Sequence, residues 1–350
     1  MRIRSTALLA AAAGAAALAR TRRPPRDAIA GEVAVVTGAS RGLGFLLARE
    51  LSRDGCRLVI CARDQAELDR AADELRSAGA EVTTVACDVT ADEAPALLVD
   101  TAVARYGRID VVINNAGLIQ VGPSQTTSEA DYEIAWRTMA FAPVRLALAA
   151  LPVMRKQAHG RIVNITSIGG KISVPHLLPY STAKFAATAF SEGLRAELGS
   201  GPITVTTVVP GLMRTGSHLQ AQFTGHRSEE FTWFSLGASL PLVSMDAERA
   251  ARQIVDAMRD RRSEVILTPA GQLVARAAPV IPELTSAVLH LAQRLLMPAA
   301  TNDNGEPLPG HALRPAFRSG AFDKLTALGR SAASRFNEVP PAGDPGRGGA

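Results

Sequence analysis

Aromatic residues are scarce in this sequence, at 4% of 350 residues, although hydrophobic residues of all kinds make up 47%. The core must therefore be built mainly from alanine, valine, leucine and isoleucine. A hydrophobic content this high excludes a chain that is disordered throughout, because enough apolar surface is available to offset the entropy lost on folding. The length allows two domains, but one large α/β domain with terminal extensions fits equally well.

Metal-ligand patterns and nucleic-acid motifs are lacking as well. Cys56, Cys61 and Cys87 are odd in number, lie among apolar residues and do not have metal-site spacing. We interpret them as buried thiols in a reducing compartment. No basic stripe is interleaved with aromatic residues, and much of the net charge of +5 comes from arginines in the first 26 residues. We expect neither a metal ion nor a nucleic-acid partner.

The apolar run near the N-terminus is short. It extends from Thr6 to Ala19, and at about 1.5 Å per residue such a helix does not cross a hydrocarbon core of about 30 Å. Three interpretations stay open for residues 1–30: peripheral membrane attachment, a plain solvent-exposed or packing helix, and a signal peptide cleaved after Ala17-Leu18-Ala19.

A glycine-rich turn follows the first predicted strand, Val33–Thr37, and precedes a helix that extends through Leu51. Glycines allow the backbone to approach a pyrophosphate, and a helix N-terminus offers unpaired N–H groups and a positive dipole. The spacing is Gly-x-x-x-Gly-x-Gly rather than Gly-x-Gly-x-x-Gly, and an ordinary turn is the competing interpretation. We predict that a dinucleotide binds here, through Gly38, Ser40, Arg41, Gly42, Leu43 and Gly44.

The second predicted strand, Arg57–Ala62, ends without the carboxylate that accepts the ribose 2′-hydroxyl of NAD. Arg63 stands there instead, and Arg41 lies in the glycine turn. A guanidinium pairs with phosphate in a bidentate manner, and we expect no carboxylate beside the two arginines to repel it, so they favour the 2′-phosphate of NADP(H). Each arginine alone could be ordinary surface charge.

Further strands alternate with helices along the chain. The run Glu81–Ala86 is followed by Asp88, which could accept a hydrogen bond from the adenine amine or cap the next helix. The run Ile109–Ile113 leads into Asn114-Asn115-Ala116-Gly117, where small residues leave room for a cofactor ribose. This alternation predicts an α/β fold with a doubly wound parallel sheet.

A serine, a tyrosine and a lysine in the middle of the chain could share one reaction. Tyr180 and Lys184 are four residues apart in an alanine-rich helical segment, so they lie on one face. A neighbouring ammonium lowers the pKa of a tyrosine, which would make Tyr180 a general acid/base. The strand-like run Arg161–Ser167 ends on a hydroxyl that could hold the same substrate oxygen. The alternative is a solvated helix face.

Together, these motifs resemble the short-chain dehydrogenase/reductase family, from about Gly31 to Pro269. The resemblance implies a Rossmann-type domain with a seven-stranded parallel sheet and a homo-oligomeric assembly. It implies that Ser167 orients the substrate, that Tyr180 is the acid/base, and that Lys184 lowers the tyrosine pKa and binds the nicotinamide ribose. The motif residues are Thr37-Gly38-x-x-x-Gly42-x-Gly44, Asn114-Asn115-Ala116-Gly117, Ser167, Tyr180-x-x-x-Lys184, Pro210, Gly211 and Thr215.

The resemblance also assigns cofactor contacts outside the glycine turn to Asn115, Pro210 and Gly211, with Thr215 at the nicotinamide carboxamide and Asp88 at the adenine. The sequence departs from the family pattern at Met139, where many relatives carry an asparagine that supports a water in the proton relay. A thioether is a poor acceptor and no donor. Either the relay is weakened, or Met139 is a packed helix residue with the water held by backbone groups.

Beyond Thr215, the segment from Gly216 to Val243 concentrates aromatic residues and could form a lid over an apolar substrate, an oligomer contact or a packed loop. We divide the chain into an N-terminal segment (1–30), a catalytic domain (31–270), an apolar helical extension (271–297) and a tail (298–350). The tail is rich in Gly, Pro, Asn and Asp, and we expect it to be largely disordered.

We therefore expect an NADP(H)-dependent oxidoreductase that interconverts a carbonyl and an alcohol on an apolar substrate. The protein would be cytoplasmic, with membrane association by its ends as the open alternative. A second hypothesis is a non-catalytic nucleotide-binding scaffold or redox sensor on the same fold, motivated by Met139. A third is a lipid-surface protein whose ends matter most.

Overall fold

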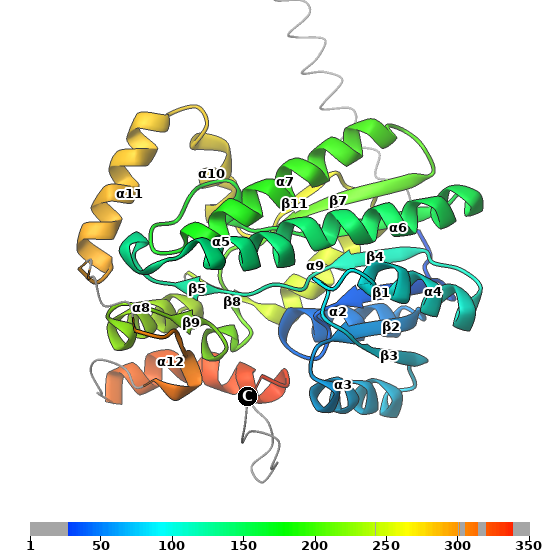
Figure 1. Cartoon of the computed structure of the whole chain (residues 1–350), viewed down its shortest axis with the longest axis horizontal. Coiled ribbons are helices and arrows are strands. Elements are labelled where there is room, and N and C mark those ends of the chain that lie inside the picture. Colours follow the sequence, from blue (N-terminus) through cyan, green and yellow to red (C-terminus); the bar gives the residue numbers. More distant parts are fainter. Residues whose placement is uncertain (1–26, 242, 300, 302–304, 314–319, 339–350) are drawn as a thin grey trace, which may run out of the picture.

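A seven-stranded parallel sheet forms the centre of the protein (Figure 1). The computed structural model describes residues 27–241, 243–299, 301, 305–313 and 320–338. Every strand pairing in this sheet is parallel, and the order is β11-β7-β6-β4-β1-β2-β3. The strands are β1 (Val33–Thr37), β2 (Arg57–Ala62), β3 (Val82–Ala86), β4 (Val111–Asn114), β6 (Gly160–Ile165), β7 (Ile203–Val209) and β11 (Glu264–Ile266). The predicted Rossmann-type α/β fold is confirmed.

Helices cover both faces of the sheet (Figure 1). One face is covered by α2 (Gly42–Arg53), α3 (Gln65–Ser77) and α9 (Ala247–Arg259). The other is covered by α4 (Ala94–Tyr106), α6 (Ala142–Gln157) and α7 (Leu178–Leu198). Because both faces are buried, the strands carry the near-continuous apolar runs typical of parallel sheets, and every residue of β1 and β7 is buried.

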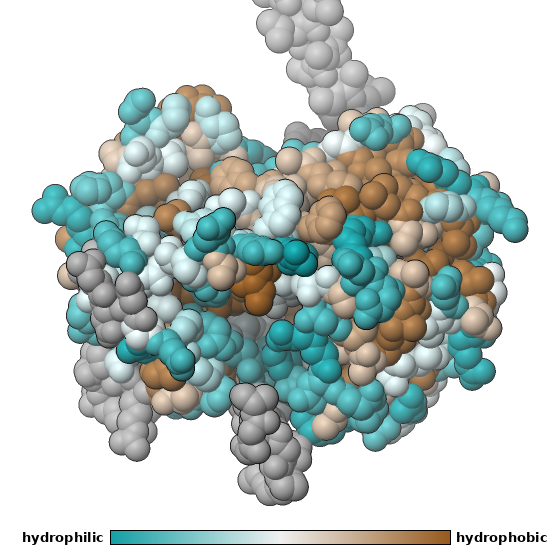
Figure 2. Space-filling view, in the orientation of Figure 1, coloured by the Kyte–Doolittle hydropathy of each residue, from teal (hydrophilic) through white to brown (hydrophobic). Residues whose placement is uncertain are grey.

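A nearly continuous helical stretch, Glu129–Gln157, is apolar and long enough to cross a membrane. It consists of α5 (Glu129–Trp136), a π-helical turn (Arg137–Phe141) and α6. Half of its most apolar window is buried inside the fold, so its length and composition alone are weak evidence for a membrane span. Its outer side still exposes large apolar residues such as Phe141 and Leu148, and Figure 2 shows hydrophobic surface over α6 and the neighbouring α4.

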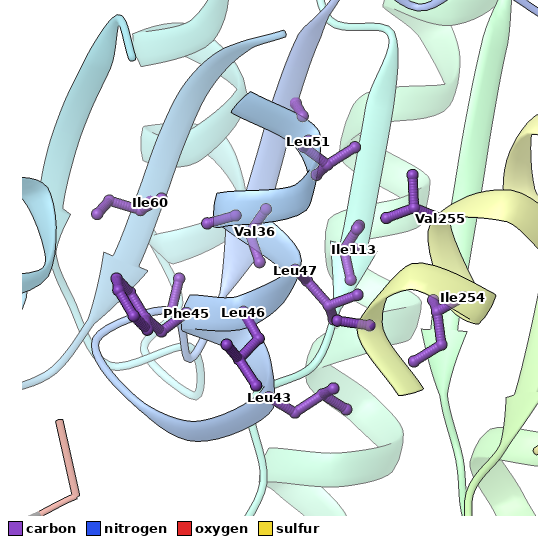
Figure 3. Close-up of a cluster of buried hydrophobic side chains, with 14 of the residues drawn as sticks. Val36, Leu43, Phe45, Leu46, Leu47, Leu51, Ile60, Ile113, Ile254 and Val255 are labelled. Atoms are coloured by element: carbon purple, nitrogen blue, oxygen red, sulfur yellow. The ribbon is translucent and has the colours of Figure 1, made fainter. Parts of the chain in front are cut away.

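The α2 helix is packed tightly onto the sheet by its leucines. Leu46, Leu47 and Leu51 are fully buried against strand residues and against α9 (Figure 3). This packing fixes the direction of α2, so that its N-terminus lies directly beyond the carboxyl end of β1. The glycine turn at this end is therefore held by the core and not by loop contacts alone.

The strand order places the functional motifs at one edge of the sheet. The chain runs from β1 outward through β2 and β3 and then returns to β4 on the other side of β1. In such sheets, ligands bind beyond the carboxyl ends of the strands at this switch point. The glycine turn follows β1, Asn115 follows β4, Ser167 follows β6 and Pro210 follows β7, so all four lie at this edge.

Smaller elements surround this edge. The segment rich in aromatic residues forms α8 (Arg227–Ser239), and the apolar extension forms α10 (Pro269–Ala277) and α11 (Pro282–Leu296). Short strands form two minor sheets, β5-β9-β12 and β8-β10. Their bounds are β5 (Gln120–Val121), β8 (Met213–Arg214), β9 (Gln222–Phe223), β10 (Met245–Asp246) and β12 (Leu308–Pro309); single 3₁₀ turns lie at Ser124–Thr126, Ile168–Gly170, Ser217–Leu219 and Gly310–Ala312.

The predicted disorder of the tail is wrong for a large part of residues 298–350. The strand β12 pairs with β9, and the helix α12 (Gly320–Arg335) packs onto α8 and β8. Ala332, Ala333 and Phe336 are buried, so this helix has an apolar face that the tail's polar composition concealed. Residues 1–26, on which the N-terminal interpretations depend, lie outside the described residues. Just after them, Asp27 forms an ion pair with Arg161, and Ile29 is buried in the domain.

A chain of buried polar side chains crosses the sheet beneath the site. The Asn114 amide donates to Asn164 Oδ1 (2.8 Å), the Asn164 amide donates to Ser191 Oγ (3.0 Å), and Ser191 shares a hydrogen bond with Thr207 (2.7 Å). These residues come from β4, β6, α7 and β7. The network therefore fixes the register of α7, which carries Tyr180 and Lys184, against the sheet.

Replacing Asn164 by alanine tests this network. We expect Asn164→Ala to lower the free energy of unfolding by about 1–3 kcal/mol for each buried partner left unsatisfied. Urea denaturation measures the loss, with Thr182→Ala on the exposed side of α7 as the control. Equal stability of the two variants would show that the network contributes nothing to the fold.

Candidate active site

Ser167, Tyr180 and Lys184 converge at the carboxyl edge of the sheet. Ser167 follows β6 and caps the short turn behind it, accepting a hydrogen bond from Gly169 N (3.0 Å). Tyr180 lies in the first turn of α7 and is hydrogen-bonded to the Ser167 side chain. The Lys184 ammonium lies 5.7 Å from the centre of the Tyr180 ring. The structure thus brings together the three side chains that the sequence predicted to converge.

Lys184 is buried in this arrangement. Its Nζ donates to the Ile165 carbonyl oxygen (2.7 Å), and its side chain is 5% exposed. Burial disfavours the charged form and lowers the pKa of Lys184 to about 8. The Ile165 carbonyl therefore aims the ammonium, and it could not be identified from the sequence because any residue type supplies a carbonyl.

The pKa of Tyr180 moves in the direction opposite to the one expected. Burial raises the pKa of the phenol, and the hydrogen bond from Ser167 offsets this only partly. We had expected the Lys184 charge to lower it, but the ammonium lies over the ring and bonds to a backbone carbonyl. In the described structure desolvation therefore exceeds the influence of the lysine on Tyr180.

The glycine turn has the geometry of a phosphate cradle. Gly38 and Gly42 have φ of 63° and 56°, in the region that favours glycine. A Cβ at Gly44 would lie 2.1 Å from the Gly38 carbonyl oxygen, so only glycine allows α2 to start this close to β1. Asn115 braces the turn by donating to the carbonyl oxygens of Thr37 (3.0 Å) and Gly38 (3.1 Å). Its amide was expected to contact a cofactor, and it holds the turn in the structure.

The arginines assigned to a 2′-phosphate have different surroundings. Arg63 is exposed just beyond β2. Arg41 forms ion pairs with Glu67 (2.5 Å) and Glu338 (3.3 Å), and Glu67 also accepts from Ser40 Oγ (3.3 Å). The expectation that no carboxylate lies near the two arginines is therefore wrong. Glu67 is contributed by the first turn of α3 and Glu338 by the distant tail, and neither proximity was visible in the sequence.

The remaining assigned cofactor residues lie around the same edge. Thr215 is buried and accepts a hydrogen bond from Ser217 N (3.1 Å), and the Pro210 carbonyl oxygen accepts from Ile168 N (2.8 Å) beside Ser167. Gly211 follows Pro210 directly. Asp88 accepts from both the backbone and the side chain of Thr90, so it forms a local turn before α4 and is not its N-cap, which is Glu93.

Met139 is a packed residue next to Tyr180. It is 1% exposed and belongs to an apolar cluster with Ala135 and Ala183, against which Tyr180 also packs. It lies in the π-helical turn between α5 and α6, a deviation often found near functional sites. These surroundings favour the packing interpretation of Met139, because an amide at this position would face apolar side chains.

The aromatic segment mainly builds a small core beside the site. Phe223, Phe231 and Phe234 are buried and stack edge to face at centroid distances of 5.6 and 6.0 Å. His218 is buried beside them, and desolvation lowers its pKa to about 4, whereas His226 is exposed. The segment thus contains both a packed core and a helix, α8, and Tyr180 packs against this core.

An unexpected buried pair ties α8 to the loop before α7. His176 Nδ1 lies 2.7 Å from Glu230 Oε1, and Trp233 Nε1 donates to Glu230 Oε2 (2.7 Å). Glu230 is fully buried and His176 is 6% exposed. Because His176 lies one turn before Tyr180, this contact positions α8 relative to the candidate acid/base. A cavity of about 560 Å³ lies farther out, between residues 171–175 and α11.

The tail also reaches the glycine turn, a contact that the sequence analysis missed. Gly42 N donates to the Phe336 carbonyl oxygen (2.8 Å), and the Asn337 amide donates to the Ser40 carbonyl oxygen (2.7 Å). The available signal was the asparagine after a helical pattern with Pro340 and Pro341 close behind, which is typical of a helix end. It indicates where α12 ends, but not what the end contacts.

A parallel sheet with a glycine turn at its switch point, and a serine, tyrosine and lysine beside it, defines a nucleotide-dependent oxidoreductase of the Rossmann type. The sequence pattern of the short chain dehydrogenase family matches residues 32–223. The chain belongs to this family, and it is an oxidoreductase.

Two curated relatives show the extent of the similarity. Dehydrogenase/reductase SDR family member 7B of Danio rerio is 34% identical over 262 residues, which cover 73% of this chain and 82% of the relative. A Streptomyces coelicolor protein assigned as a ketoacyl reductase is 38% identical over 186 residues, covering 53% of this chain and 71% of the relative.

Solved structures agree with the fold. A short-chain dehydrogenase/reductase from Burkholderia phymatum in complex with NAD has a TM-score of 0.68 and 26% identity, covering 79% of this chain and 99% of that one. A metagenomic short-chain oxidoreductase in complex with NADP has a TM-score of 0.56 and 29% identity, covering 69% and 99%. The neighbours therefore include both forms of the cofactor.

The burial of Lys184 predicts a measurable pH dependence of stability. Its pKa is about 8 in the folded protein, against an ordinary value of 10.5, so the unfolded chain binds more protons between these pH values. The lysine's contribution to the free energy of unfolding therefore rises from pH 8 to 10.5, and below pH 8 burying the charge costs roughly 3 kcal/mol.

We expect Lys184→Met to be more stable than the parent protein at pH 7, and this advantage to shrink towards pH 10.5. The measurement is the parent-to-variant difference in urea denaturation at the two pH values. Lys156→Met, at an exposed lysine, is the control and should show no such change. A pH-independent difference for Lys184→Met would contradict the assigned pKa.

Proposed function

We propose that this protein is an NADP(H)-dependent oxidoreductase that interconverts a carbonyl and an alcohol, with Tyr180 as the acid/base. The observation that carries the proposal is the convergence of Ser167, Tyr180 and Lys184 beside the glycine turn. Hydroxyl groups on two elements face one point, and a buried ammonium lies behind them. Such a set can hold and protonate one oxygen atom.

The chain's own residues would act on the substrate oxygen. Ser167 would donate a hydrogen bond to it, while Tyr180 would pass its phenolic proton to the oxygen in reduction and remove it in oxidation. Lys184 would stabilise the phenolate left on Tyr180 and hold the nicotinamide ribose. The nicotinamide, when bound, supplies or accepts the hydride at the carbonyl carbon.

A dinucleotide at the turn from Gly38 to Gly44 is supported by its glycines, because Gly38 and Gly44 let the turn pack this closely and Gly42 leaves the N-terminus of α2 without a Cβ. The amides of Gly42 and Leu43 would bind the pyrophosphate, and Asp88 and Thr215 would contact the adenine and the carboxamide. The preference for NADP(H) is supported by Arg63, which is exposed at the end of β2. Glu67 opposes it by pairing with Arg41, so Arg63 would determine most of the preference.

An apolar substrate is supported by the surroundings of Tyr180. Ile119, Val174 and Leu212 are partly buried in the same cluster as the tyrosine ring, next to the aromatic core under α8. The relative assigned as a ketoacyl reductase is consistent with a carbonyl on an aliphatic chain. A homo-oligomer is supported by the exposed Phe141, Leu148 and Phe185 on the helices α6 and α7 and the turn before them. We assign a cytoplasmic location, where the cofactor is available.

Replacing Tyr180 by phenylalanine tests the acid/base assignment. We expect Tyr180→Phe to lower turnover of a ketone panel by about 10²–10⁴-fold, the usual contribution of general acid/base catalysis. The dissociation constant of NADPH should stay within about two-fold, because the change removes one hydroxyl and little volume. Tyr132→Phe, on α5, is the matched control. Turnover in Tyr180→Phe close to that of the parent would place the acid/base elsewhere.

The cofactor preference can be tested at Arg63. The parent should bind NADPH about ten-fold more tightly than NADH, because a charge-assisted contact contributes about 1.5–3 kcal/mol. Arg63→Asp should remove this preference, and Glu67→Gln should strengthen it by removing one of the two carboxylates that pair with Arg41. Titration calorimetry with both cofactors gives the affinities, and Arg252→Asp on the exposed side of α9 is the control. Equal affinities in the parent would exclude the NADP(H) assignment.

A further inference from the structure

The last described residues of the chain occupy the groups that a dinucleotide would use. The N-terminus of α2 has no acidic residue in its first turn and no side-chain cap from Arg41. Gly42 N donates instead to the Phe336 carbonyl oxygen (2.8 Å). A backbone oxygen from the tail thus satisfies an amide of the kind that binds a phosphate in dinucleotide-binding turns.

The tail also brings a negative charge to the same place. The Glu338 side chain is 5% exposed, and a Cβ at Gly42 would lie 2.7 Å from its Oε1. The same Cβ would lie 3.8 Å from Thr215, so the carboxylate and the residue assigned to the nicotinamide end both lie next to Gly42. Arg41 Nε lies 3.3 Å from Glu338 Oε2. An anion against a helix N-terminus and an arginine is the arrangement that a pyrophosphate would make.

The Glu338 carboxylate is held in place by the turn that ends α12. The helix α12 ends in a Schellman motif, in which Glu338 N donates to the Ala333 carbonyl oxygen (3.0 Å) and Asn337 has φ of 59°. Asparagine tolerates this left-handed conformation better than most residues. Its amide is bound to the carbonyl oxygens of Ser40 (2.7 Å) and Glu67 (3.2 Å). The turn that ends α12 is thus docked on both sides of Arg41.

The helix itself is also anchored to the segment after Thr215. Ala333 is 1% exposed, and a Cβ at Gly216 would lie 2.4 Å from the Ala333 Cβ. The Gln220 amide donates to the Glu338 carbonyl oxygen (2.8 Å). The tail therefore contacts both the glycine turn and the segment after Thr215, and its anchors include residues outside the turn.

We propose that residues 320–338 are an internal competitor of the dinucleotide, with the Glu338 carboxylate and the Phe336 carbonyl in the place of the pyrophosphate. The inference rests on the proposed nucleotide site. Nucleotide binding then requires the tail to leave the turn, so the apparent affinity equals the intrinsic affinity multiplied by the fraction of molecules with the tail displaced. A tail that is docked ten times more often than not weakens binding about ten-fold.

Two variants of the full-length protein displace the tail by different means. Glu338→Ala removes the carboxylate and keeps the helix, and Ala333→Trp forces α12 away from Gly216 without altering the glycine turn. Glu283→Ala removes an exposed carboxylate on α11 and is the matched control. Titration calorimetry with NADPH and NADH measures affinity, and hydrogen exchange at the Gly42 amide without nucleotide measures docking.

We expect both tail variants to bind NADPH at least about five-fold more tightly than the parent and the control, with faster exchange at Gly42. Equal affinities in all four folded proteins, with turnover intact, would overturn the inference and leave the proposed function standing. Weaker binding in Glu338→Ala would make the tail a part of the nucleotide site, which also overturns it. No nucleotide binding and no turnover in any of the proteins would reject the proposed function itself.

Discussion

The N-terminus of α2 is the constraint around which the site is arranged. Its first amides point away from the helix and need an acceptor, and the glycines that bring them next to β1 leave no side chain to provide one. The leucines of α2 and the amide of Asn115 hold this end rigidly. An acceptor from elsewhere must therefore meet it, and in the described structure the Phe336 carbonyl oxygen does so, with the Glu338 carboxylate beside it.

The candidate catalytic side chains are positioned by β6 and α7, and not by the N-terminus of α2. Ser167 comes from the end of a strand, and Tyr180 and Lys184 come from a helix whose register is fixed by Asn164 and Ser191 across the sheet. Because both the serine and the helix are tied to β6, small movements of outer loops do not change their separation. Burial then fixes their chemistry, raising the pKa of Tyr180 and lowering that of Lys184. A bound cofactor would change that environment by adding hydroxyl and phosphate groups.

The two halves of the site are connected through the segment after Thr215. It carries α8, which is tied to the loop before Tyr180 by the buried pair of His176 and Glu230, and it also supports α12. We therefore expect a movement of α12 to affect the loop before Tyr180 as well as the glycine turn. The segment after Thr215 therefore contacts both the loop before Tyr180 and the helix α12 that reaches the glycine turn.

The sequence by itself determined the parallel α/β fold, the glycine turn and the serine, tyrosine and lysine, because these depend on local periodicity and on side-chain types at short spacing. It could not locate Glu67 and Glu338 beside Arg41, because ion pairs across 26 and 297 residues arise only when separate elements pack. The order of α12 was hidden for the same reason, since its few buried residues gain stability only by packing against elements distant in the sequence, such as α8 and β8. The direction of the Tyr180 pKa was likewise decided by tertiary burial, which outweighed the charge expected from spacing alone.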